Sequence, residues 1–82
     1  MPRSQKARAR VALLREKQRR LHEVMHISLK REQELFEEWQ DDPLSEFKQA
    51  LWEKHRQDSK AAIAKFDKAT AAYLAARTAL LK

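Results

Sequence analysis

The chain has 82 residues, of which 43% are hydrophobic and 37% are charged, so it forms one small domain with a limited core. It contains no glycine and no cysteine, which disfavours tight hairpin turns, phosphate-binding loops, disulfides and thiolate zinc sites. No apolar run reaches the roughly 18 residues of a membrane span, and we expect a cytoplasmic protein without a membrane partner or a cofactor.

The formal net charge of +6 is distributed unevenly along the chain. Residues 1–31 carry +8, residues 32–53 carry −7 and residues 54–82 carry +5. An acidic middle therefore separates two basic ends. Such a pattern bears on solubility and on the choice and orientation of partners more than on the fold.

The first predicted element is a long helix over about residues 4–40, preceded by a short basic arm over residues 1–5. Its apolar residues recur at the helical period. Leu14, Leu21 and Leu35 keep a seven-residue spacing in which Ser28 takes the missing place. An apolar stripe that tolerates a polar residue at one of its positions is typical of the contact line between the helices of a coiled coil.

The strongest helix breaker inside the chain is the segment Asp41-Asp42-Pro43. We expect Asp42 to cap a second helix in which Pro43 takes the first position. This helix is predicted over about residues 43–81, with its own apolar stripe at spacings of three and four. Residues 57–59 are its weakest point, but the absence of glycine there favours one continuous helix.

Two predicted helices of similar length joined by a short turn favour an all-α antiparallel helical hairpin, a single domain over residues 1–82. Residues whose numbers sum to about 83 should then lie opposite each other, which pairs Phe36 with Phe47 and Trp39 with Leu44. A contact between two helices hides only one stripe of each helix, too little to offset the entropy of ordering the chain. We therefore expect oligomerisation or a partner to complete the fold.

A second apolar surface on the C-terminal helix is the candidate partner-binding site. It lies about 90° around the helix from the stripe that faces the hairpin. We call it the ridge, and its residues are Trp52, Ile63, Thr70, Leu74 and Leu81. The nine alanines between Ala61 and Ala79 let a neighbouring helix approach closely, although alanine also simply favours a helix. The ridge predicts a non-enzymatic interaction or assembly module: an adaptor, a regulator or an inhibitor.

The partner at the ridge is a second copy or a different protein with an amphipathic helix. In an antiparallel pair of hairpins, the acidic turn of each copy lies beside the basic ends of the other. A parallel pair places like charges together. The charge pattern therefore favours an antiparallel homodimer among the possible homo-oligomers.

Basic residues on the first helix predict an alternative function, nucleic-acid binding. Six of them follow one outward face of the helix and form a basic row: Arg8, Arg15, Arg19, His22, His26 and Lys30. Such a row can follow phosphates and release counterions as it binds. The alternative interpretation is that the basic row is an ordinary charged helix face in contact with solvent and has no ligand. No base-reading motif is present, so binding would be directed at the phosphate backbone.

Residues 22–26 read H-E-V-M-H and resemble the H-E-x-x-H motif of zinc proteases, in which two histidines ligate the metal and the glutamate acts on a bound water. The resemblance covers five residues only, without the glycine turn and third histidine that follow in many such enzymes. His55, predicted to lie opposite about residue 28, is a conceivable third ligand. The serines lack a neighbouring base. We predict no metal site, no catalytic residue and no small-molecule substrate.

Overall fold

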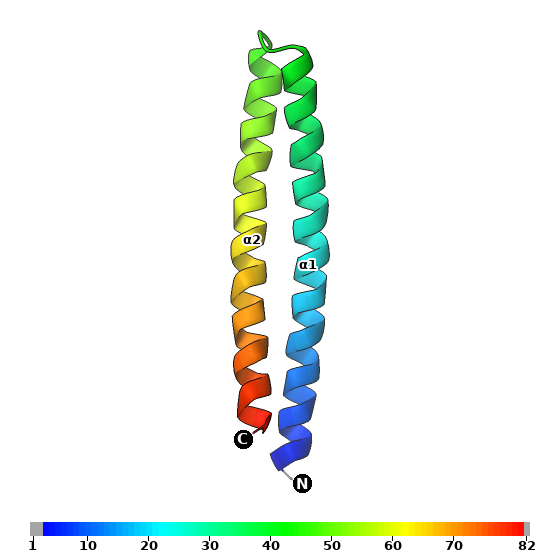
Figure 1. The fold of residues 1–82 in the computed structure, drawn as a ribbon, viewed down its shortest axis with the longest axis vertical. Helices are drawn as coiled ribbons and strands as arrows, with labels where there is room; N and C mark the ends of the chain where they lie inside the picture. Colours follow the sequence, from blue (N-terminus) through cyan, green and yellow to red (C-terminus); the bar gives the residue numbers. More distant parts are fainter. Residues whose placement is uncertain (1–2, 82) are drawn as a thin grey trace.

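The structure is a computed structural model and describes residues 3–81. Two helices, α1 (Arg3–Asp41) and α2 (Glu46–Leu81), run antiparallel and side by side, with the two ends of the chain at the same end of the molecule (Figure 1). The molecule is 63 Å long and 14 by 13 Å across. The predicted all-α helical hairpin is confirmed, and the described residues contain no strand.

The bounds of the helices differ from the predicted ones at both N-termini. α1 begins at Arg3, so residues 3–5 are helical rather than part of an extended arm, and residues 1 and 2 of that arm lie outside the described residues. α2 begins at Glu46, three residues later than predicted. It continues without a break through residues 57–59, as expected from the absence of glycine.

The turn explains the later start of α2. The N–H of Asp42 donates to the carbonyl of Trp39 at 3.0 Å and ends α1, and the N–H of Ser45 donates to the carbonyl of Asp42 at 3.0 Å. Pro43 therefore occupies the second position of a four-residue turn, where its fixed φ is also favourable. The Ser45 hydroxyl accepts the N–H of Lys48 at 3.2 Å, so Ser45 caps α2 and the prediction of Asp42 as the cap was wrong.

This turn shifts the register of the hairpin. Ser28 lies opposite Ser59 and Phe36 lies against Trp52, so facing residues have numbers that sum to 87 or 88 rather than 83. The predicted pairs of Phe36 with Phe47 and of Trp39 with Leu44 were therefore wrong. The two expected partners project from the hairpin instead, with Leu44 93% exposed and Phe47 76% exposed.

The seam, the line of residues along which the two helices meet, follows a heptad spacing, with steps of four and three in both helices. The α1 residues of the seam are Ala7, Val11, Leu14, Gln18, Leu21, Met25, Ser28, Glu32, Leu35 and Trp39. The α2 residues are Lys48, Trp52, His55, Ser59, Ala62, Phe66, Ala69, Tyr73, Ala76 and Leu80. Among residues 3–81 only Leu35, Ser59 and Ala69 are buried, so the hairpin has almost no closed core of its own.

Polar layers interrupt the seam. The Ser59 side chain is 2% exposed, and its hydroxyl lies 3.2 Å from the Ser28 hydroxyl and donates to the Ser28 carbonyl at 3.3 Å. Nearer the chain ends, the Gln18 amide donates to the Thr70 hydroxyl at 3.0 Å. Satisfied polar pairs at seam positions favour one register over slipped alternatives.

Candidate functional site

The predicted ridge is divided between the interior and the surface of the hairpin. Trp52 packs inside, because its ring stacks on Trp39 with centroids 5.1 Å apart and lies 5.2 Å from Phe36. Thr70 also contacts the other helix, since its hydroxyl accepts the hydrogen bond from Gln18. These two half-buried ridge residues therefore contact α1 within the hairpin.

The other three ridge residues are exposed and form a row that we call the exposed ridge. Ile63 is 37% exposed, Leu74 is 48% exposed and Leu81 is 78% exposed. Their spacing places them on the side of α2 that carries Thr70, next to the seam. The structure therefore leaves an uncovered apolar row along the C-terminal part of α2.

A groove of about 600 Å³ opens on this side of the seam. It lies in the open half of the hairpin, by which we mean residues 3–24 and 63–81; residues 25–62 form the tip half. The apolar lining of the groove consists of Val11, Ala12, Phe66, Tyr73 and Leu80. Its basic lining consists of Arg8, Arg15, Arg19 and His22. We call it the arginine groove.

The arginine groove brings together two surfaces that the sequence predicts as separate sites. Four residues of the predicted basic row line it from α1. The ring of His22 lies 5.3 Å from that of Phe66, and Gln18 bonds to Thr70 across the seam. The exposed ridge lies on the Thr70 side of α2. It therefore forms the rim of the arginine groove that faces the basic row of α1. His26 and Lys30 continue the basic row beyond the groove toward the tip.

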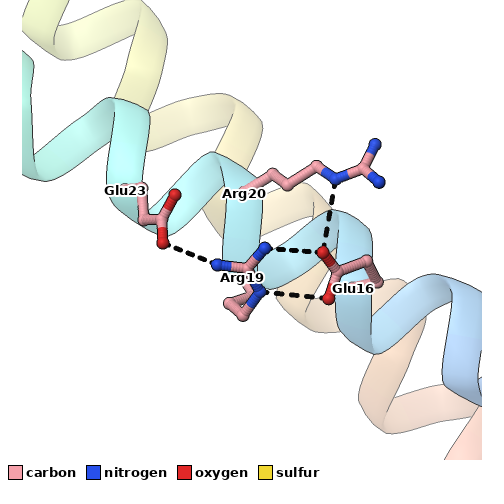
Figure 2. A network of polar contacts seen from close by, with 4 residues as sticks. All are labelled: Glu16, Arg19, Arg20 and Glu23. Atoms are coloured by element: carbon pink, nitrogen blue, oxygen red, sulfur yellow. Dashed lines mark hydrogen bonds and ion pairs between the residues drawn. The ribbon is translucent and has the colours of Figure 1, made fainter.

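The arginines of the row differ in their charge environment. Figure 2 shows Arg19 between two carboxylates, bonded to Glu16 at 2.6 and 3.0 Å and to Glu23 at 2.6 Å, while Arg20 reaches Glu16 at 3.4 Å. The hydrogen bonds from Arg19 lower the pKa of Glu16 to about 2, and the same contact raises the pKa of Arg19. Arg19 is thus largely neutralised by its own helix.

Arg8 and Arg15 have no such partner. Within the part of the chain that the structure describes, neither forms an ion pair, and both are exposed. They project from the same side of α1 two turns apart, at the edge of an apolar groove. These two guanidinium groups are therefore available to carboxylates or phosphates of a ligand.

The two histidines of the H-E-x-x-H segment lie one helical turn apart on α1. The rings of His22 and His26 are stacked with centroids 6.3 Å apart, as one turn of a helix requires. The predicted position of His55 was wrong, because Ser59 occupies the place opposite residue 28 and the register puts His55 opposite Glu32. Among residues 3–81 no group of three or more ligand side chains can hold a metal ion.

A second groove, which the sequence analysis missed, lies on the other side of the seam. It consists of two connected hollows of about 320 and 270 Å³ that share Leu21 and Lys65. Its lining includes Leu14, Lys17, Leu21, Val24, Asp58, Ala61, Lys65, Lys68, Ala69 and Ala72. We call it the alanine groove. The available signal was the apolar pair Val24 and Ile27: Val24 flanks the predicted apolar stripe of the first helix, and Ile27 is not part of it.

Comparison of the chain with protein-family models, with curated proteins and with solved structures gives no match, so its own residues carry the functional proposal. Neither helix, over the residues described, is long and apolar enough to cross a bilayer.

Proposed function

We propose that the chain is a non-enzymatic helical interaction module, an adaptor, regulator or inhibitor, whose arginine groove binds an amphipathic helix of a partner protein. The partner helix presents an apolar stripe to the groove and carboxylates to its basic rim. The observation that carries the proposal is the amount of surface that the hairpin leaves uncovered.

The hairpin exposes 6634 Å² of surface. A compact monomer of 9.7 kDa exposes about 5,100 Å² by the usual scaling with mass, which leaves an excess of about 1,500 Å². A stable interface covers about 800 Å² on each partner, so the excess corresponds to roughly two interface patches. The two grooves, one on each side of the seam, are the hollowed surfaces where such patches fit.

The chemistry of the arginine groove selects the partner. Phe66, Tyr73 and Leu80 offer apolar area in a groove of about 600 Å³, into which side chains of a neighbouring helix can pack. Arg8 and Arg15 along the rim favour carboxylates on the edge of that helix. Apolar burial then supplies most of the affinity, and the charges supply orientation and the rate of encounter.

Titration with a synthetic helix tests this proposal. The probe has leucine in a helical stripe and glutamate at its other positions, and a control probe has lysine in place of glutamate. We expect the glutamate probe to bind and the lysine probe to bind at least tenfold more weakly. Leu74→Asp should weaken binding at least tenfold, whereas Ala71→Asp, which adds the same charge on the outer face of α2, should have a smaller effect. Equal binding of both probes, or an unaffected Leu74→Asp variant, would contradict the proposal.

The second candidate function is binding of nucleic acid along the basic row, favoured by the unpaired state of Arg8 and Arg15. Such binding uses the arginines but not the apolar rim, so it leaves the leucines of the exposed ridge uncovered. It predicts retention on duplex or single-stranded nucleic acid that weakens steeply with salt. Arg15→Ala should reduce the salt slope by about 1, and Leu74→Asp should have little effect. Absence of retention at low salt would remove this candidate.

A further inference from the structure

The side of the hairpin that carries the alanine groove has a different character in its two halves. In the tip half, large apolar side chains project from it: Ile27 is 69% exposed and Phe47 is 76% exposed. In the open half, the α2 positions that continue the groove are Ala72, Ala75 and Ala79, all exposed. On α2, the tip half thus presents a large side chain and the open half presents small ones, while on α1 the open half also carries the exposed Leu13.

The charges on this side follow the same division. The outer α1 positions of the open half are basic and include Arg10, Lys17 and Arg20. The corresponding positions of the tip half, reached by the same steps of three and four, are Ile27, Arg31, Glu34, Glu38 and Asp41, where Arg31 pairs with Glu34 at 3.2 Å and with Glu38 at 4.0 Å and the sum is acidic. On α2, Asp58 lies in the tip half and Lys65 in the open half. Each half is therefore complementary to the other in charge as well as in size.

We infer that a second copy of this chain covers the alanine groove in an antiparallel orientation. A two-fold axis places the same face of both copies in contact, so the tip half of each lies on the open half of the other. Phe47 and Leu51 of one copy then pack over Ala72, Ala75 and Ala79 of the other. The carboxylates of the tip half face the lysines and arginines of the open half.

The two-fold axis passes near Val24 and Ile27, which lie close to the middle of the hairpin and are exposed in one copy. Burial of these side chains and of Phe47 supplies the stability, because exposed ion pairs contribute only about 0–1 kcal/mol each. The charges select the antiparallel arrangement over the parallel one. This inference goes beyond the proposed function, because it uses the opposite side of the hairpin and leaves the arginine groove free.

Measurement of the native mass by sedimentation equilibrium tests the inference. The parent chain should form a dimer, twice 9.7 kDa. Val24→Asp should shift the population to monomer and raise the dimer dissociation constant at least tenfold. Leu74→Asp is the matched control, since Leu74 is 48% exposed and Val24 is 55% exposed, and it should leave the dimer intact.

Cross-linking provides a second test, which reports the orientation of the two copies directly and adds no charge to the interface. The chain has no cysteine, so the pair Phe47→Cys and Ala75→Cys can be introduced alone. These positions lie about 42 Å apart within one hairpin at 1.5 Å per residue, and only an antiparallel partner brings them together. A short bis-maleimide should yield covalent dimers with this pair, and far fewer with the control pair Phe47→Cys and Ala71→Cys.

The outcomes separate this inference from the proposed function. A parent chain that stays monomeric, or equal cross-linking of both cysteine pairs, overturns the second copy at the alanine groove and leaves the helix-probe titration as an independent test. A dimer that Leu74→Asp dissolves and Val24→Asp does not also overturns it, and shows that the copies associate through the exposed ridge.

Discussion

The two halves of the hairpin share one fold but pack differently. In the tip half, Leu35 is 1% exposed and three aromatic rings lie within 6.0 Å of one another, those of Phe36, Trp39 and Trp52. The guanidinium of Arg56 covers the ring of Trp52 at 5.6 Å. The tip half therefore closes its own seam with large side chains.

The open half lacks such a cluster. Its α2 seam alternates large residues such as Phe66 and Tyr73 with Ala69 and Ala76, and a groove remains on each side. The small residues bring the helices together but leave apolar surface uncovered. One region of the hairpin thus holds the helices in register, while the other leaves apolar surface open.

Loss of packing in the tip half should give the largest effect. Leu35→Ala should lower the free energy of unfolding by about 2–5 kcal/mol, because a buried leucine loses its contacts and leaves a cavity. Leu21→Ala, at the equivalent seam position of the open half, should cost clearly less, because Leu21 borders a groove that is already open. Urea denaturation measures both values.

Both leucine variants are compared in chains that also carry Val24→Asp, so that the proposed second copy does not cover Leu21. Equal losses in the free energy of unfolding for Leu35→Ala and Leu21→Ala would contradict the difference in packing between the tip half and the open half.

The serine layer in the middle of the seam should have an intermediate effect. Ser59→Ala removes the hydrogen bonds to Ser28 and should cost about 1 kcal/mol. The double variant Ser28→Ala and Ser59→Ala should cost less than twice this value, because no hydroxyl is left unpaired. Thermal or urea unfolding of the two single variants and the double variant gives a double-mutant cycle. Strictly additive losses in the free energy of unfolding would argue against coupling between the two serines.

The ion-pair cluster of the open half should give the smallest effect, visible in the pH dependence of stability. The folded state lowers the pKa of Glu16 from 4.5 to about 2 through its hydrogen bonds with Arg19. Because the folded-state pKa is the lower one, the stabilisation is fully present above about pH 4.5 and is lost as the pH falls toward 2. Glu16→Gln should remove this part of the acid destabilisation, most clearly at low salt.

Thermal unfolding of the parent and Glu16→Gln chains between these pH values checks the ion-pair prediction. Parallel curves for the two chains over the whole interval would show that the contact between Glu16 and Arg19 does not stabilise the open half.

The sequence was sufficient for the hairpin, because seven-residue spacings and a single Asp-Pro breaker admit few other arrangements. It was not sufficient for the register, since Asp42 and Ser45 are both good caps and only three-dimensional packing decides between them. The register changed which residues face each other, and the structure also shows Trp52 and Thr70 of the predicted ridge in contact with α1. It also determined that the basic row and the exposed ridge share one groove.

The alanine groove was harder to predict for a different reason. Alanine is common in helices whether or not it is part of an interface, so its pattern on α2 carries little information by itself. Its meaning depends on which α1 residues lie across the seam. Only when the seam of α2 is known to pass through Trp52 do Phe47 and the alanines of the open half fall on one side of the hairpin.

The dependence of thermal unfolding on protein concentration tests most directly whether this hairpin is completed by association. If a second copy covers the open half, the midpoint of unfolding should rise by several degrees between about 1 and about 100 μM chain, because association stabilises the folded state by mass action. A midpoint that stays constant over this range, with a native particle of 9.7 kDa throughout, would contradict the account.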